Sequence, residues 1–440
     1  MIRIPRQLES IYAAIALWFF FGNPINVLNN GADGSQLIDT QTVSSSFLLP
    51  GISMAIYCIS VLILLNCWET TLSRITKNPQ LVLLGLFLLI VIASTQWSAY
   101  PVYTLRRSVL VLGSTAFAVF FSTRFSFTQQ LKMLTFAFGV TIVLCFFISL
   151  FFPVYGTMTA PHAGAWRGVH MHKNELGAQM GFISIFLLVV RSTDLFRGLT
   201  KAVVSVLVVG SVFLVVASTS TTGLVILFTL GIASILCNML RLNYQYAVPV
   251  VNISLIVMML IFFYIQFNLE TLLGVFDKGT DLTGRDQLWP AVLQMVSQKP
   301  LLGYGYEGFW RGSASPGAYI WKVAGWPTPN AHNGYLDLLL ATGYIGGFLF
   351  FAGLMFNLFK SLARVGMTKN ACAICPIIAL LFLMMSNTTE TTFFVSDSWI
   401  LYVWISLIPA QPFELNPEHL TAHPSRQGST YCGSGEFSSG

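Results

Sequence analysis

Ionisable side chains gather in a few short segments of this chain, although only 9% of all residues are charged. Residues 167–175 hold two histidines, an arginine, a lysine, an asparagine and a glutamate. The last two fall in the first turn of an expected helix, and a helix N-terminus beside cations attracts phosphate. The segment is a predicted anion site, unless it is merely a solvated loop with a capped helix. Its candidate residues are Arg167, His170, His172, Lys173 and Asn174.

Arg285 opens a second segment, residues 281–298. Five apolar residues follow it on one helical face: Leu288, Trp289, Val292, Met295 and Val296. This pattern predicts an amphipathic helix in the membrane interface, with Trp289 at headgroup depth and Arg285 at its start. A guanidinium keeps its charge and bonds phosphate oxygens in pairs, which suits a pyrophosphate. The alternative is a surface arginine paired with Asp281 or Asp286.

His332 stands where the chain is expected to return to the membrane. A neutral imidazole can accept a proton from a hydroxyl nucleophile, so His332 is a candidate base. Asn333 and Tyr335 could orient the imidazole or a substrate, although a single histidine is more often structural.

Two apparent motifs are discounted. Residues 303–308 match the dinucleotide pattern Gly-x-Gly-x-x-Gly, but no βαβ unit surrounds them. We expect a flexible turn beneath an aromatic cluster there. His170 and His172 have chelating spacing, yet no second ligand pair is nearby, so no metal is expected.

The composition of the chain indicates a membrane protein. The chain has 440 residues, 55% of them hydrophobic, and a mean hydropathy of +0.71, whereas a soluble domain carries about 25% charged residues. The apolar runs are continuous rather than alternating, so the predicted fold is all-α and polytopic rather than a β-barrel. About twelve spans are expected, near residues 10–28, 47–66, 79–97, 103–121, 131–152, 174–190, 199–217, 222–240, 247–266, 334–359, 371–386 and 395–410. The first is interpreted as an uncleaved span.

Lysine and arginine set the expected orientation, with the N-terminus and every basic loop in the cytoplasm. The outer loops at 29–46, 218–221 and 387–396 contain no lysine or arginine. Topology therefore leaves several outer cations unexplained: Arg106, Arg107, Arg167, Lys173, Lys278, Arg285, Lys299, Arg311 and Lys322. One of the adjacent pair Arg106 and Arg107 should snorkel or face a polar cavity. The net charge of +6 follows from the cytoplasmic bias, so no nucleic-acid partner is expected.

Together these motifs resemble the O-antigen ligase and polymerase superfamily, and most of all its exopolysaccharide polymerases. The matching residues are Arg167, His172-Lys173-Asn174-Glu175, Thr283-Gly284-Arg285, Gly303-x-Gly305 and His332-Asn333-x-Tyr335-Leu336. The resemblance covers roughly residues 80–400. It implies a metal-independent, inverting glycosyltransferase of the GT-C kind, without a cofactor. It also implies that Arg167 and Arg285 hold the pyrophosphate and that His332 activates the acceptor hydroxyl, with Arg311 as the candidate second arginine of the long loop.

The expected function is polymerisation of a glycan carried on undecaprenyl pyrophosphate, with the hydroxyl of another lipid-linked repeat unit as acceptor. Transfer to lipid A-core, as in a ligase, is the main alternative. A flippase or transporter is less favoured because the span centres carry few charges. Membrane lipids, a chain-length regulator and a flippase are the further partners considered.

The expected organisation is one transmembrane domain at 1–410, with a long periplasmic loop at 267–333. We expect it in the bacterial inner membrane, with the site on the periplasmic side. The tail at 411–440 is expected to be disordered and partly artificial, because residues 433–437 resemble an engineered linker. The central hypothesis is that Arg167, Arg285 and His332 meet at the outer end of the bundle.

Overall fold

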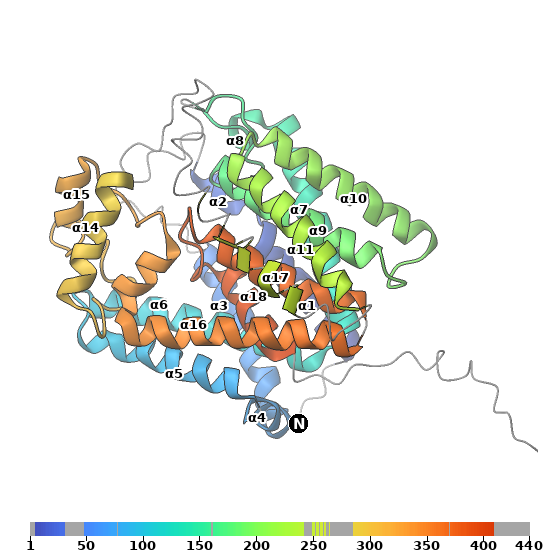
Figure 1. Ribbon diagram of the computed structural model, residues 1–440, viewed down its shortest axis with the longest axis horizontal. Helices are drawn as coiled ribbons and strands as arrows, with labels where there is room; N and C mark the ends of the chain where they lie inside the picture. Colours follow the sequence, from blue (N-terminus) through green and yellow to red (C-terminus); the bar gives the residue numbers. More distant parts are fainter. Residues whose placement is uncertain are drawn as a thin grey trace, which may run out of the picture.

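The computed structural model describes residues 5–30, 48–76, 78–159, 162–241, 285–368 and 370–408, together with short stretches between 249 and 264. Within these ranges the regular secondary structure is helical, apart from an isolated β-bridge between Thr157 and Trp166 (Figure 1). The expected all-α polytopic fold is confirmed. The expected span 247–266 lies largely outside the described residues, as do residues 267–284 of the long loop and the tail 411–440.

Eight described helices are long and apolar enough to cross a membrane. They are α3 (Leu48–Leu65), α5 (Pro79–Ala93, continued by η1, Ser94–Gln96), α6 (Pro101–Arg124), α7 (Phe127–Phe151), α9 (Lys173–Arg191), α10 (Gly198–Ala217), α11 (Thr221–Met239) and α16 (Gly334–Thr368). Shorter helices are α1 (Arg6–Gly22), α2 (Ile25–Asn30), α4 (Trp68–Thr76), α8 (Pro153–Gly156), α14 (Arg285–Gln298), α15 (Ala318–Ala324), η2 (Ala371–Ile374), α17 (Cys375–Ser386) and α18 (Ser396–Leu407). The eight long helices, with α1, α17 and α18, match the expected spans other than 247–266.

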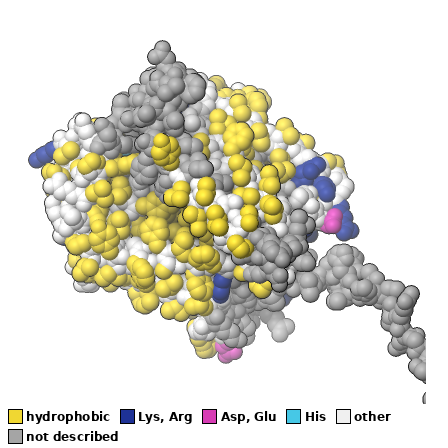
Figure 2. All heavy atoms as spheres, in the orientation of Figure 1, with side chains coloured by type: hydrophobic (Ala, Val, Ile, Leu, Met, Phe, Trp, Pro, Cys, Tyr) yellow, Lys and Arg dark blue, Asp and Glu magenta, His cyan; other side chains and the backbone are white. Residues whose placement is uncertain are grey.

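The outer helices present apolar side chains to their surroundings. On α10, for example, Leu199, Val206 and Val209 are largely exposed. Hydrophobic side chains cover much of the face in Figure 2, and lysine and arginine lie near its edges. Such a surface is stable against lipid tails and would be costly in water.

The two shortest expected spans turn out to form the centre of the bundle. Every residue of α17 is buried, and so is α18 from Ser398 onwards. At 12 residues each, they rise about 18 Å, less than the roughly 30 Å of a bilayer core. They can be short because protein rather than lipid surrounds them: α9 and α11 pack against α17, and α6 packs against α18. Their connection, residues 387–395, therefore emerges in the middle of one end of the bundle.

That end is opposite the basic loops. α9, α11, α16 and α18 begin there, and α7 and α17 end there. At the other end, Arg124 closes α6 and forms a 2.8 Å ion pair with the buried Glu9 of α1. Lys132, Arg191 and Lys201 follow the same polarity along their helices.

A break in α16 fixes the second half of the long loop onto the bundle. Gly343 has φ 63° and ψ −169°, a conformation that is open essentially to glycine alone. On either side of it the helix and the loop exchange backbone hydrogen bonds. Tyr344 N donates to Pro300 O at 2.7 Å, and Tyr304 N donates to Leu340 O at 2.7 Å. Residues 300–305 are thus joined to α16, rather than forming the flexible turn expected from their glycines.

The predicted amphipathic helix is present as α14, but its apolar face packs against protein. Leu288, Val292 and Val296 are buried in a cluster with residues of α15, the loop after α14 and α16. The indole N–H of Trp289 donates to the carbonyl of Ala331 at 3.0 Å. Placement of this face in the membrane interface is therefore wrong, because the folded loop supplies its own apolar partner. Figure 1 shows α14 and α15 beside the start of α16.

Candidate functional site

His332 lies in the turn that leads into α16. Its backbone has φ 48°, in the left-handed region, and its N–H donates to the Asn330 side chain at 2.8 Å. A left-handed residue other than glycine costs about 1–2 kcal/mol, and such strain is concentrated at functional sites. The ring is 26% exposed, and its Nδ1 lies 3.8 Å from a carboxylate oxygen of Glu390.

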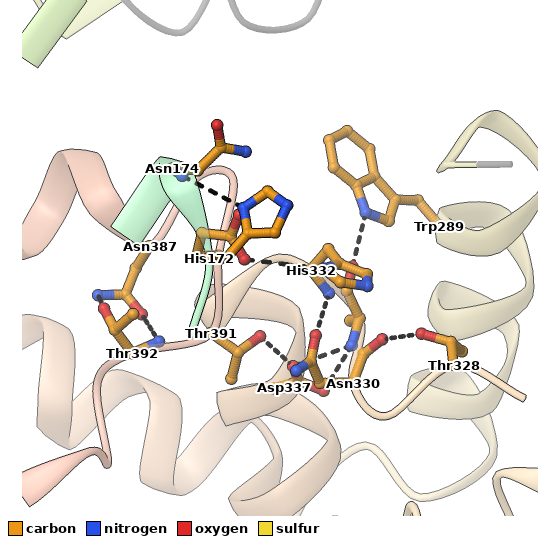
Figure 3. Close-up of polar contacts among 12 residues, drawn as sticks. His172, Asn174, Trp289, Thr328, Asn330, His332, Asp337, Asn387, Thr391 and Thr392 are labelled. Carbon is orange, nitrogen blue, oxygen red and sulfur yellow. Dashed lines mark hydrogen bonds and ion pairs between the residues drawn. The ribbon is translucent and has the colours of Figure 1, made fainter. Parts of the chain in front are cut away.

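The Asp337 side chain accepts hydrogen bonds from three segments that surround this turn. This carboxylate, in the first turn of α16, accepts from Ala331 N at 3.0 Å, from Trp310 Nε1 at 2.8 Å and from the Thr391 hydroxyl. The histidine turn, the aromatic loop and the α17–α18 connection are thereby held together. Figure 3 shows Asp337 below His332, with Thr391 and Asn330 on either side.

Asn333 and Tyr335, predicted to orient the imidazole or a substrate, have protein partners. The Asn333 side chain accepts from the backbone N–H groups of Tyr335 and Leu336, at 3.0 and 3.2 Å, and so caps α16. The Tyr335 hydroxyl donates to Met384 O at 2.7 Å. Both side chains position His332 indirectly, by fixing the start of its helix.

Arg167 is 1% exposed, and its Nε donates to Tyr155 O at 2.8 Å. Its guanidinium thus stabilises α8 from within the protein. Nearby, His170 Nδ1 lies 3.5 Å from a Glu175 carboxylate oxygen. Burial by itself would lower the pKa of His170, but hydrogen bonds with the Cys145 thiol and Glu175 outweigh burial and raise it to about 10. Neither residue presents its charge as an open anion site.

The next three candidates lie at the start of α9. His172 Nδ1 accepts from Asn174 N at 3.2 Å and caps the helix. The Asn174 side chain accepts from the Ser220 hydroxyl at 3.2 Å, and Lys173 Nζ donates to Thr219 O at 3.4 Å. Burial lowers the pKa of His172, although the charge of Glu390 opposes the effect. Residues 172–174 and 218–220 therefore form one joined corner of the bundle.

A cavity of about 230 Å³ joins this corner to the histidine turn; we call it the polar pocket. Its lining comprises His172, Asn174, Glu175, Ala178, Gln179, Thr222, Asn330, Phe382, Ser386, Thr389, Glu390, Thr391, Thr392, Val395, Asp397 and Ser398. Glu390 contributes to its wall and also faces His332. In Figure 3, His172 and Asn174 lie on one side of His332 and Trp289 on the other.

A second cavity, of about 170 Å³, shares Asn330 and Thr391 with the polar pocket. Arg311 lines it, forms a 2.8 Å ion pair with Glu307, and stacks 3.7 Å above the Tyr103 ring.

Arg107 approaches the same tyrosine, and its Nε donates to the Tyr103 hydroxyl at 2.7 Å. Of the neighbouring pair on α6, Arg106 is exposed and Arg107 faces this polar cluster. Arg107 is therefore the member of the pair that faces polar groups, as the sequence predicted for one of the two arginines.

The backbone of Arg285 begins α14, but its side chain lies outside the described part of the structure. One turn further on, Trp289 bonds to Ala331, the residue before His332. Arg285 therefore starts a helix whose first turns lie against the histidine turn. The polar pocket brings His172, Asn174, Asn330 and Glu390 together, and Glu390 faces His332. Arg167 is buried and donates to Tyr155 O. Within the described residues, no group of three or more His, Cys, Asp or Glu could hold a metal ion.

Glu390 is the site residue that sequence reasoning did not select. Its signal was weak: a single acidic residue in the short outer connection between two apolar runs. Its significance depends on packing, because Gly334 N donates to both Asn387 O and Glu390 O, at 2.9 and 3.1 Å. These bonds bring the α17–α18 connection to the start of α16 and so to His332.

Comparison with known proteins supports the motif-based interpretation. Residues 203–351 match the family model described as O-antigen ligase, a region that contains both Arg285 and His332. The exopolysaccharide production protein ExoQ of Rhizobium meliloti (strain 1021) is 29% identical over 101 residues, which are 22% of this chain. The matched region spans 23% of that protein's length. Over these residues the chain is similar to the O-antigen ligase family and to an exopolysaccharide production protein.

Proposed function

We propose that this protein is a membrane glycosyltransferase that polymerises glycan repeat units carried on undecaprenyl pyrophosphate. The observation that carries the proposal is His332, held in a strained turn beside a polar cavity at the end of the bundle opposite the basic loops. By the positive-inside rule this end faces the periplasm, and the membrane is the bacterial inner membrane.

The reaction joins an acceptor hydroxyl oxygen to the anomeric carbon of the donor sugar and breaks that carbon's bond to pyrophosphate oxygen. His332 accepts the hydroxyl proton, and undecaprenyl pyrophosphate leaves with the bonding electron pair. Attack opposite the leaving group inverts the anomeric centre. Arg285, at the start of α14, offsets the charge that develops on the diphosphate.

Arg311 is the described cation best placed to assist, because it lines the cavity adjoining the polar pocket. Arg167 contributes differently in this scheme: it anchors the loop that carries residues 170–173, and its guanidinium donates to the carbonyls of Tyr155 and Met171. No step of the proposal uses a metal ion.

The test uses protein purified into nanodiscs together with lipid-linked repeat units. Wild type should give a ladder of polymer, and His332→Ala and Arg285→Ala should each abolish it while folding normally. The control is Arg197→Ala, in the loop before α10 at the opposite end. Polymer of wild-type length from both site variants would refute the proposal.

A ligase is the second candidate, favoured by the family match over residues 203–351. The same assay separates the two, because a ligase requires added lipid A-core and attaches the glycan to it. A polymerase lengthens lipid-linked glycan without that acceptor. A flippase would form no covalent product in either reaction.

A further inference from the structure

We propose that the polar pocket is the subsite for the terminal sugar of the acceptor, and that it selects an uncharged sugar over an acidic one. The inference rests on the proposed function and names the substrate class of its acceptor side. It begins from the charge of the cavity wall. The lining includes the carboxylates of Glu175, Glu390 and Asp397, and none of its described residues is lysine or arginine.

The remaining positive candidate in this wall is His172, whose pKa is lowered by burial. Its Nδ1 accepts a backbone hydrogen bond, so the neutral ring carries its proton on Nε2. That N–H can donate to a hydroxyl oxygen. A uronic acid or a pyruvylated sugar would instead bring a negative charge beside the carboxylates of Glu390 and Asp397, since the third carboxylate, Glu175, is already paired with His170.

The wall also offers what a neutral sugar requires. Asn174, Asn330, Thr222 and Ser398 supply amide and hydroxyl groups. Phe382, stacked on Phe182 with ring centroids 4.6 Å apart, gives the cavity an apolar surface suited to the C–H face of a sugar ring.

One buried hydrogen-bond acceptor in the pocket wall, the side-chain oxygen of Gln179, has no donor among the described residues. Gln179 is 6% exposed, and its Nε2 donates to Phe21 O and to Asp397, at 3.3 and 3.4 Å. Its Oε1 is buried and has no hydrogen-bond partner among the described residues. Leaving a buried polar atom unsatisfied costs about 1–3 kcal/mol, and a sugar hydroxyl would remove that cost once the amide turns towards the cavity.

Size and position agree with this role. A volume of about 230 Å³ is many times the roughly 10–15 Å³ of cavity that a single water molecule needs, so the cavity has room for a ligand larger than water. Glu390 joins the cavity to His332, at 3.8 Å from its Nδ1. A ring in the pocket would therefore present a hydroxyl towards the histidine turn.

The test measures binding separately from catalysis. The probes are methyl glucoside, methyl galactoside and their methyl uronide counterparts, observed by saturation-transfer NMR on the protein in nanodiscs. Thr222→Phe fills the pocket from the start of α11. Its matched control is Thr221→Phe, because Thr221 is exposed and is not among the lining residues.

At least one neutral glycoside should bind to wild type and Thr221→Phe, lose its signal in Thr222→Phe, and outcompete its uronide at least tenfold. Equal binding of the uronide, an undiminished signal in Thr222→Phe, or no binding of any neutral probe to wild type would overturn the subsite. If polymer forms but Thr222→Phe leaves the acceptor KM unchanged, the subsite fails and the proposed function stands. If polymer never forms but the pattern of binding holds, the proposed function fails, and the pocket binds a neutral sugar without being the acceptor subsite of a polymerase.

Discussion

Replacing Glu390 by glutamine tests whether the charge beside His332 contributes to the reaction. The substitution removes a negative charge and leaves the length and shape of the side chain almost unchanged. The carboxylate lies 3.8 Å from His332 Nδ1, which is too long for a direct hydrogen bond, so the contact is mainly electrostatic. In the proposed reaction the imidazole becomes positive as it accepts the hydroxyl proton, and the carboxylate stabilises that charge.

The size of the effect follows from the distance. Two unit charges 3.8 Å apart attract by about 1 kcal/mol in bulk water and by about 4 kcal/mol at an effective dielectric constant of 20. The His332 and Glu390 side chains are 26% and 32% exposed, so solvent and salt screen the pair and the lower end applies. Because about 1.4 kcal/mol corresponds to tenfold in rate, an effect of about 1 kcal/mol predicts that Glu390→Gln lowers kcat about fivefold.

The assay is the initial rate of polymer formation in nanodiscs, with donor and acceptor varied separately. The loss should fall on kcat, and Glu390→Asp, which keeps the charge, should recover part of the rate. Glu69→Gln, an exposed carboxylate on α4, is the control and should match wild type. A full rate in Glu390→Gln would refute the reasoning. So would an equal loss in Glu390→Asp with unchanged thermal stability, because charge would then not be the cause.

Three further predictions concern the elements that support the site. Gly343→Ala should lower the free energy of unfolding by at least about 1–3 kcal/mol through backbone strain, because its Cβ would also collide with the Leu301 carbonyl. Thermal unfolding would measure this against Gly85→Ala, whose Cβ meets open space, and equal midpoints would contradict the account of the α16 break. Arg167→Lys should cost about 1–3 kcal/mol of stability through lost buried hydrogen bonds and should retain polymer formation at low temperature; normal stability with lost activity would instead return Arg167 to a role in ligand binding. Because folding raises the pKa of His170 from 6.5 to about 10, its contribution to stability is complete below pH 6.5 and is lost as the pH rises towards 10. The unfolding midpoint of wild type should therefore exceed that of His170→Gln at low pH by a margin that shrinks towards pH 10, and a constant margin would count against the shift.

The amino-acid sequence was sufficient for the architecture because the bilayer makes local composition decisive. Apolar runs of the required length become helices, since backbone groups in lipid must satisfy their hydrogen bonds within the segment. The periodicity of apolar residues also predicted that a helix starts at Arg285, which is α14, and that His332 lies in the turn just before the helix α16. Short motifs in a consistent order were enough to indicate the superfamily.

Packing between distant segments could not be predicted in this way. The runs that became α17 and α18 looked like short spans, but in the structure they are the buried core. The apolar face of α14 is compatible with lipid or protein, and its choice depended on residues of α15 and α16. Periodicity shows that a face is apolar and does not identify its partner.

The sequence by itself determined the class of molecule, the number and polarity of most helices, and the histidine to which the proposed chemistry is assigned. Tertiary structure alone decided that Arg167 is buried with its Nε on the carbonyl of Tyr155, and that Arg107, rather than Arg106, faces a polar cluster. It also decided that Glu390 lies beside His332. The physical reason is that a side chain's role depends on its neighbours across the fold, which burial and hydrogen bonding between distant segments establish, whereas helix formation in a membrane depends on residues close together in the chain.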